Sequence, residues 1–246
     1  MATAIKTAAQ IRRLERHGGG VYSLELAPER RVPRYKPGQF LHLALDGYDP
    51  SRHWPESRAF SIASAPGSGV VRITYSVVGQ FTRRLEAEAA EGKTVWIKLP
   101  YGEFVVEDGR ETVLVAGGTG VTAFTAYLEG MSEGMSGGMS GGMSGAAVHV
   151  LYGARRAELL VYRERIEEWR RKNARVRVMY FAEEGACGEG IREGRLRCED
   201  VYGAAARPEE AVFYLSGPPG MLKAFSEELR SRYGVEAERI RIDAWE

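Results

Sequence analysis

Apolar and polar positions alternate in short runs over the first hundred residues, and turns rich in glycine or proline separate the runs. Alternation with a period of two is typical of strands that bury one face. The pattern predicts strands at Ile5–Leu14, Val21–Leu26, Phe40–Leu45, Arg58–Ile62, Val70–Val77 and Thr94–Leu99. Several short strands at this spacing favour a sandwich or a barrel.

A single helical stretch interrupts these strands between Thr82 and about Glu91. Leu85 and Ala89 are four residues apart, so they share one face of a helix. Gly92 follows and is predicted to cap the C-terminus of this helix.

From about Glu111 the pattern changes to strands that alternate with helices. Strands are predicted at Thr112–Ala116, Ala147–Tyr152, Arg175–Phe181, Ala211–Leu215 and Arg239–Ile242. Between them, apolar residues recur at helical spacing at Leu159, Tyr162, Ile166 and Trp169, and again at Leu222, Phe225 and Leu229. This alternation is typical of a parallel sheet with right-handed crossovers. We therefore expect two domains, residues 1–108 and 109–246.

The segment 130–145 fits neither pattern, because the unit Gly-Met-Ser repeats along it. Its methionines, Met131, Met135, Met139 and Met143, are four residues apart. Each glycine costs a helix about 1 kcal/mol, so a flexible surface excursion is the favoured interpretation. Soft sulfur ligands suit Cu(I), and a copper site or a partner surface is the alternative.

The apolar run 113–116 ends in a cluster of glycines and then in residues that predict a helix. A strand, a glycine turn and a helix start suit a phosphate-bearing nucleotide. Glycines let the backbone approach the anion, and the first N–H groups of the helix face it. Gly118, Gly120 and Ala123 match the G-x-G-x-x-A spacing of such sites. A purely structural turn is the alternative.

Composition excludes several classes of function. A net charge of +1 over 246 residues offers no basic surface of the kind that nucleic-acid binding needs. We find neither an apolar window long enough to span a membrane nor a signal-peptide pattern, so we expect a cytoplasmic protein. The two cysteines, Cys187 and Cys198, do not form a Cys-x-x-Cys pair. This argues against an iron–sulfur cluster or a structural zinc site, and no metal is expected.

Further motifs surround the glycine turn in a fixed order along the chain. They are Pro37-Gly38-Gln39-Phe40, Arg58-Ala59-Phe60-Ser61, Val78-Gly79-Gln80-Phe81-Thr82, Pro100-Tyr101-Gly102-Glu103-Phe104, Ser216-Gly217-Pro218-Pro219-Gly220-Met221 and Asp243-Ala244-Trp245-Glu246. This ordered set spans nearly the whole chain and resembles the ferredoxin–NADP reductase superfamily. The resemblance implies an antiparallel Greek-key β-barrel that holds FAD, followed by a five-stranded parallel α/β domain that holds NAD(P)H.

In that family, the arginine of an Arg-x-Tyr/Phe-Ser motif binds the phosphate of the flavin nucleotide. The aromatic residue packs beside the flavin, and the serine reaches flavin N5. The resemblance carries these roles to Arg58, Phe60 and Ser61, with Ser61 as a catalytic residue. The other residues implied at FAD are Ile62, Arg72, Thr74, Tyr75, Gly79, Gln80, Phe81 and Thr82. The structural alternatives are a surface ion pair for Arg58, core packing for Phe60 and Ile62, and helix capping for Thr82.

On the nicotinamide side, the resemblance implies a second set of contacts. The residues implied at the pyrophosphate of NAD(P)H are Gly118, Thr119, Gly120, Val121 and Thr122. Those that resemble the family's Cys-Gly-Pro-x-x-Met segment beside the nicotinamide are Gly217, Pro218 and Met221. Ser216 stands where the family has the cysteine and keeps a polar atom there, so it is the second residue assigned to catalysis.

Two pairs of charged residues bear on the choice between NADH and NADPH. Arg155 and Arg156 follow the second parallel strand, where a 2′-phosphate would be met, and Arg155 is assigned to the nucleotide site. Glu183 and Glu184 follow the third strand, where carboxylates would repel that phosphate and accept from a ribose diol instead. The sequence leaves this choice open.

Trp245 stands one residue from the C-terminus, just beyond the fifth parallel strand. In the resembling family an aromatic residue near the C-terminus often covers the flavin ring, which implies a catalytic and cofactor-binding role for Trp245. Packing against the sheet edge or the barrel is the alternative.

The resemblance implies an enzyme that passes hydride from NAD(P)H, its co-substrate, to FAD and then delivers electrons to a separate acceptor. Ferredoxin or an oxygenase component is the first expectation for that acceptor. One alternative is a flavin reductase that uses free flavin as a diffusing substrate. Another is an electron-transfer subunit docked permanently in a larger complex.

Overall fold

The computed structural model describes residues 3–132, 145–185 and 188–243, and within these ranges the strands form two six-stranded sheets. The first sheet is antiparallel and has the order β4-β3-β6-β1-β2-β5. Its strands are β1 (Ile5–Gly18), β2 (Val21–Pro28), β3 (Phe40–Ala44), β4 (Ser57–Ser61), β5 (Val71–Ser76) and β6 (Thr94–Tyr101). Just past β4, Ala63 N–H donates to Arg72 O on β5 at 2.7 Å, so the two ends of the order meet in a nearly closed barrel.

The barrel interior follows the period-two pattern of its strands. On β6, Val95, Ile97 and Leu99 are fully buried, whereas the residues between them point outward. Helix α1 (Gln80–Glu88) adds Phe81 and Leu85 to the same apolar cluster.

The helix is shifted from its predicted position and begins at Gln80. The C-cap is Ala89, in extended conformation, so the prediction that Gly92 caps the helix is wrong. Gly92, with φ +87°, makes the turn into β6 instead, and its N–H donates to Ile11 O at 2.8 Å.

The second sheet is entirely parallel and has the order β10-β9-β8-β7-β11-β12. Its strands are β7 (Thr112–Gly117), β8 (Val148–Arg156), β9 (Val176–Glu184), β10 (Ile191–Glu193), β11 (Val212–Ser216) and β12 (Ile240–Ile242). The five predicted strands are all present. The predicted total is wrong, because the short edge strand β10 adds a sixth, and Ile191 is the one apolar residue among its three.

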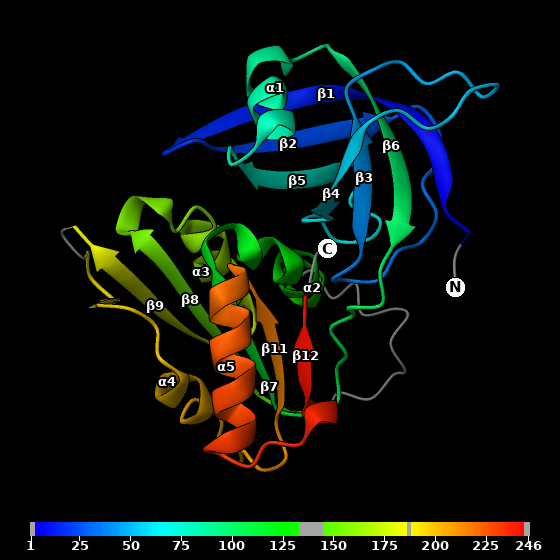
Figure 1. The fold of residues 1–246 in the computed structure, drawn as a ribbon. Helices are drawn as coiled ribbons and strands as arrows, with labels where there is room; N and C mark the ends of the chain where they lie inside the picture. The colour runs from blue at the N-terminus through cyan, green and yellow to red at the C-terminus, as the bar shows by residue number, and fades with distance from the viewer. Residues whose placement is uncertain (1–2, 133–144, 186–187, 244–246) are drawn as a thin grey trace.

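Helices cover both faces of this sheet (Figure 1). They are α2 (Thr122–Ser132), α3 (Arg163–Lys172), α4 (Cys198–Tyr202) and α5 (Pro219–Ser231), with 3₁₀ turns η1 (Gly118–Val121), η2 (Ala157–Leu159) and η3 (Ala237–Arg239). Phe124 of α2 and Ile166 of α3 belong to one apolar cluster, and Phe225 of α5 to the other. Because strands such as β7 are buried on both faces, they read in the sequence as unbroken apolar runs.

The glycine-rich segment begins inside a helix. Gly130, Met131 and Ser132 form the last turn of α2, and Met131 packs against the apolar cluster beneath it. The rest of the repeat, residues 133–144, lies outside the described residues, so the flexible excursion stays a prediction. Among the helices that the structure describes, we find none with the length and apolar character that a membrane span requires.

Cys198 is a free thiol buried beneath α5. Burial raises its pKa to about 12, so the thiol stays protonated at neutral pH. Cys187 lies outside the described residues.

Leu85 is fully buried where α1 closes the barrel. We expect Leu85→Ala to lower the free energy of unfolding by about 2–5 kcal/mol, because it removes apolar contacts and leaves a cavity. Chemical denaturation measures this loss. Arg83→Ala on the exposed face of the same helix is the control, and equal losses in the two variants would contradict this packing.

Candidate functional site

The guanidinium of Arg58 lies at the N-terminal end of α1. It sits 5.3 Å from the centre of the Phe81 ring, and Phe81 is the second residue of the helix. The Arg58 side chain is half exposed and pairs with Glu56 at 3.0 Å, an exposed partner that a stronger anion can replace. A cation beside a helix N-terminus is suited to a phosphate group.

The hydroxyl of Thr82 is already used within the turn that starts α1. It accepts from the N–H groups of Val78 and Gly79, both at 3.0 Å, and donates to Gly79 O at 3.1 Å. Thr82 therefore fixes the turn. The N–H groups of Gln80 and Phe81, which a helix start leaves without an intrahelical acceptor, are the donors available to an anion.

Phe60 and Ser61 face opposite sides of β4, as neighbours on a strand must. The Phe60 ring packs inside the barrel, 6.0 Å from the ring of Tyr75 and 6.4 Å from that of Phe81, and Ile62 is buried in the same cluster. Ala63 shares the parity of Ser61 and belongs to the apolar cluster of the parallel-sheet domain. Ser61 thus lies on the side of the barrel that meets the second domain.

Arg72 and Thr74 on β5 are committed to protein partners. The Arg72 guanidinium contacts Glu25 at 3.2 Å and Glu129 at 3.3 Å. Burial opposes its charge, yet the neighbouring carboxylates, led by Glu129, raise the pKa of Arg72. The Thr74 hydroxyl contacts the Tyr162 hydroxyl at 2.8 Å. The structure therefore directs these two side chains toward the second domain.

Tyr75, also assigned to FAD from the sequence, is buried and stacks on Tyr22 with ring centres 5.5 Å apart. Among the described residues its hydroxyl has no hydrogen-bond partner, and burial raises the pKa of Tyr75 well above its ordinary value. It packs in the barrel core with Phe60.

The glycine turn follows β7 at the point where the sheet order reverses, with β8 on one side of β7 and β11 on the other. Nucleotides bind at such switch points, beyond the carboxyl ends of the strands. Gly118 has φ +55°, and within the described residues no atom lies within 4 Å of the place where its Cβ would be. Its backbone is therefore open to a ligand.

Gly117 and Gly120 are needed for a different reason. A Cβ on Gly117 would lie 2.8 Å from Pro218 Cδ, and one on Gly120 would lie 2.7 Å from Gly217 N and closer still to Ser216 O. These two glycines let the turn after β7 pack directly on the turn after β11. Of the three glycines, only Gly118 is left for close approach to a ligand.

Of the remaining residues of the turn, Val121 lies in the core, and Thr119 and Thr122 make hydrogen bonds. Val121 is fully buried, and the Thr122 hydroxyl donates to Thr119 O at 2.8 Å. The Thr119 hydroxyl accepts from Ser76 Oγ at 3.4 Å, at the end of β5. That contact brings the glycine turn to the strand that leads into α1.

Ser216 ends β11 and donates its hydroxyl hydrogen to Asp243 Oδ2 at 2.8 Å. Both side chains are buried, and Asp243 N–H donates to Leu215 O at 2.9 Å. Gly217 packs against Met221, whereas Pro218 is exposed. The sequence placed Asp243 only in a terminal motif. Its place directly after the short strand β12 (Ile240–Ile242) was the signal that could have singled it out.

The charged residues at the ends of β8 and β9 neutralise one another. Arg155 Nε contacts Glu184 Oε1 at 3.1 Å, and Arg195 contacts Glu183 Oε2 at 2.9 Å, with all four side chains at the surface. Arg195 was missed from the sequence because it follows the edge strand β10, and the pairing of β10 with β9 brings it to Glu183. Trp245 lies outside the described residues, so its role stays a prediction.

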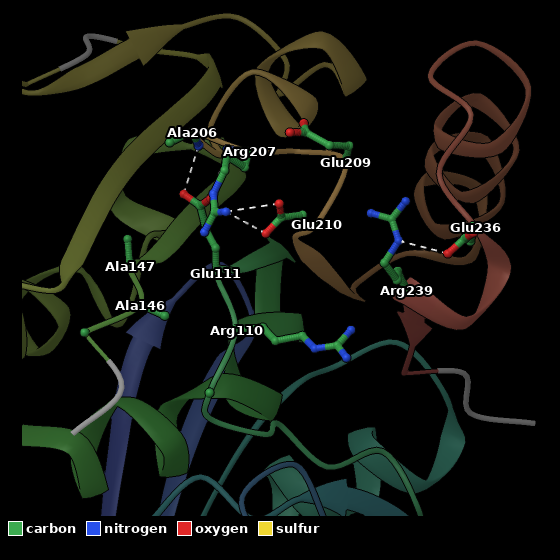
Figure 2. Close-up of a pocket in the computed structure, with 12 residues that line it drawn as sticks. Arg110, Glu111, Ala146, Ala147, Ala206, Arg207, Glu209, Glu210, Glu236 and Arg239 are labelled. Atoms are coloured by element: carbon green, nitrogen blue, oxygen red, sulfur yellow. Dashed lines mark hydrogen bonds and ion pairs between the residues drawn. The ribbon is translucent and has the colours of Figure 1, made fainter. Parts of the chain in front are cut away.

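A cavity of about 880 Å³ lies at the opposite edge of the parallel sheet. Figure 2 shows its lining, which includes the ion pairs Arg207–Glu210 and Arg239–Glu236. Its residues come from segments that precede β7, β8, β11 and β12. It is therefore separate from the glycine turn, which follows the carboxyl end of β7.

The family model for the oxidoreductase NAD-binding domain matches residues 114–227. Ferredoxin–NADP reductase B of Sorangium cellulosum is 27% identical over 228 residues, which cover 86% of each chain. The probable electron transfer subunit of dihydroorotate dehydrogenase B (NAD(+)) from Methanopyrus kandleri is 38% identical over 106 residues, 43% of this chain. The chain spans 37% of that relative and about half (56–57%) of the flavohemoproteins it also matches.

Among solved structures, the flavohem-like FAD/NAD binding domain of nitric oxide dioxygenase from Vibrio cholerae has the same fold. Its TM-score is 0.80 at 20% identity, and the match covers 97% of this chain and 98% of that one. The barrel, the glycine turn and the matched domain are similar to those of oxidoreductases that use a flavin and a nicotinamide dinucleotide. The chain is thus similar to ferredoxin–NADP reductases in sequence and to FAD/NAD-binding proteins in fold, and these similarities support FAD and NAD(P)H as its cofactors.

The two turn glycines Gly118 and Gly120 should respond differently to the same change. Gly118→Ala places a methyl group in open space at a left-handed position, at a cost of about 1–2 kcal/mol. Gly120→Ala forces a clash with the backbone of Ser216, which no side-chain rotation relieves, so we expect more than ~3 kcal/mol. Chemical denaturation of both variants measures this order, and the reverse order would contradict the packing of the two turns.

Proposed function

We propose that this chain is an NAD(P)H-dependent flavoprotein reductase, with residues 1–108 holding FAD and residues 109–246 holding NAD(P)H. The observation that carries the proposal is the contact between Ser76 and Thr119, at 3.4 Å. Ser76 lies three residues before Gly79, the N-cap of α1, and Thr119 lies in the glycine turn. The contact supports a site between two turns that we assign to anion binding, one from each domain, as hydride transfer between two dinucleotides requires.

At the flavin end, Arg58 and the first N–H groups of α1 would bind the pyrophosphate. This donor set fits the group, because a forked cation and a helix N-terminus both favour an anion. Ser61, on the barrel face toward the second domain, would lie beside the flavin ring. Arg72 and Thr74 are proposed to take no part in binding FAD, since their polar atoms are already engaged.

At the nicotinamide end, the open backbone of Gly118 fits a pyrophosphate at the start of η1 and α2. Ser216 donates its hydrogen to Asp243, so its remaining lone pairs would present an acceptor to the nicotinamide. Trp245, which follows Asp243 by two residues, is proposed to cover the flavin ring until nicotinamide arrives. When bound, FAD would take a hydride from NAD(P)H and supply electrons to an acceptor.

The acceptor is proposed to be a separate protein, either a ferredoxin or an oxygenase component. The name of the Sorangium relative supports a ferredoxin. The name of the Methanopyrus relative supports a second candidate, an electron-transfer subunit docked in a larger complex. A flavin reductase is the third candidate, and the engagement of Arg72 and Thr74 favours it, because fewer polar contacts are left to retain the flavin.

Spectroscopy of the purified protein tests the proposal. We expect a flavin absorption spectrum that survives gel filtration and is bleached by anaerobic addition of NADH or NADPH. Flavin that separates on the column but is still reduced when added back would identify the flavin reductase. Co-purification with a second protein at fixed stoichiometry would identify the docked subunit. A protein that neither binds nor reduces flavin in all of these experiments would contradict the three candidate functions.

Arg58→Ala should weaken flavin binding, because it removes the cation assigned to the pyrophosphate. A charge-assisted hydrogen bond contributes about 1.5 kcal/mol or more, so we expect a Kd at least about tenfold higher. Flavin fluorescence on dilution measures it. The control is Arg52→Ala, an exposed arginine on the preceding loop. Unchanged affinity in a folded Arg58→Ala protein would contradict the assignment.

Replacing both Glu183 and Glu184 by arginine should shift preference toward NADPH. The change removes two carboxylates and releases Arg155 and Arg195 from their ion pairs, which leaves several cations for a 2′-phosphate. We expect the ratio of kcat/KM for NADPH over NADH to rise about tenfold or more, from ~1.4 kcal/mol of added attraction. An unchanged ratio would mean that these strand ends do not face the adenosine ribose.

A further inference from the structure

Helix α2 joins the two halves of the proposed site. It begins directly after the turn Gly118–Val121, and two of its later residues hold the segment that follows β4. Thr125 Oγ1 donates to Ala63 O at 2.8 Å, and Ala65 N–H donates to Glu129 Oε2 at 2.6 Å. Thr125 and Glu129 are four residues apart and share one helix face.

Glu129 is a buried carboxylate at this junction. Its second oxygen, Oε1, contacts Arg72 at 3.3 Å, and Arg72 in turn contacts Glu25 of β2 at 3.2 Å. Arg72 and Glu129 are each at most 9% exposed. Burying two charges costs free energy unless they are paired with good geometry. The pair therefore adds little net stability, but it restricts the two side chains and the elements that carry them to few relative positions.

The outer face of β5 contacts the second domain at three successive outward positions. Arg72 contacts Glu129 of α2, Thr74 contacts Tyr162 just before α3, and Ser76 contacts Thr119 in η1. One strand of the barrel therefore meets three separate elements of the other domain.

We propose that Arg72 and Glu129 are positioning residues, whose buried ion pair fixes how the turn Gly118–Gly120 is held relative to Ser61. The proposal rests on the proposed function, because it concerns the geometry between the flavin and the nicotinamide. From Thr122 to Glu129, α2 is about 10 Å long. A tilt of the helix about Glu129 therefore displaces its N-terminal end, and with it the turn Gly118–Gly120. A misplacement of about 1 Å costs a transfer step up to about a hundredfold.

Glu129→Gln is the test variant. The amide keeps an oxygen for Ala65 N–H but leaves Arg72 with only one carboxylate. We expect single-turnover flavin reduction at saturating nicotinamide to fall ten- to a hundredfold. Flavin content and the Kd of nicotinamide should change less than threefold. A loss confined to thermal stability, with a wild-type transfer rate, would leave Glu129 a structural residue and overturn the proposal.

The double variant Arg72→Gln and Glu129→Gln tests for rescue. Two amides hydrogen-bond to each other without a charge between them, and Glu25, which is 22% exposed, keeps Arg165 at 4.0 Å, so we expect most of the lost rate to return. A double variant no faster than Glu129→Gln would count against the pair. Glu228→Gln on α5 breaks an exposed ion pair with Arg232 and serves as the matched control.

Hydrogen exchange in the absence of nucleotides separates this proposal from the proposed function. The amide oxygen of Gln is a weaker acceptor for Ala65 N–H than the carboxylate, so we expect Glu129→Gln to speed exchange at the Ala65 amide about tenfold relative to wild type and to Glu228→Gln. Unchanged exchange overturns the inference whether or not the protein binds flavin, whereas a wild-type protein without flavin rejects only the function. Should Glu129→Gln fail to fold, Thr125→Val is measured in the same way, because it removes the bond to Ala63 O, together with a bond to Thr122 O inside the helix, and leaves Glu129 in place.

Discussion

The interface along β5 sets the geometry on which the rest of the structure depends. A strand presents alternate residues to one side, so a single strand can line an interface with polar groups while its other face fills a core. On β5 the inward residues Val71, Ile73 and Tyr75 complete the barrel interior. The outward residues Arg72, Thr74 and Ser76 meet the parallel-sheet domain. The same six residues thus build one domain and orient the other.

The glycines of the site answer to two different constraints. Gly117 and Gly120 allow two backbone turns to touch, since any Cβ there would meet Pro218 or the backbone after β11. Gly118 adopts a left-handed conformation over open space. Close packing between turns and open access to a ligand therefore occur within four residues. The turn is thus tightly packed at Gly117 and Gly120, while the backbone at Gly118 stays accessible.

Charged residues are used differently at the interface and at the outer end of the site. Arg72 and Glu129 are buried, where a charge without its partner is costly and the geometry is correspondingly strict. Arg155, Glu184, Arg195 and Glu183 are at the surface, where ion pairs are weak and exchange readily with solvent or with a ligand. The buried pair suits a fixed arrangement of domains, and the surface pairs suit discrimination between related nucleotides.

The sequence by itself determined the class of fold, because its patterns are local. Period-two runs predicted the six barrel strands, strand-like runs between helical stretches predicted five of the parallel strands, and the order of motifs gave the resemblance to the ferredoxin–NADP reductase superfamily. Local patterns also located Arg58 and Gly118, whose backbone settings depend on near neighbours. Local patterns did not predict the strand β10, which has a single apolar residue among its three. They also misplaced the start of α1, which lies at Gln80, because the start of a helix depends on its cap. Only the tertiary structure decided that Arg72 and Thr74 face the second domain, that Asp243 holds Ser216, and that Arg195 joins Glu183. Each of these contacts forms through tertiary packing, and sequence spacing carries no record of which partner a polar group will meet.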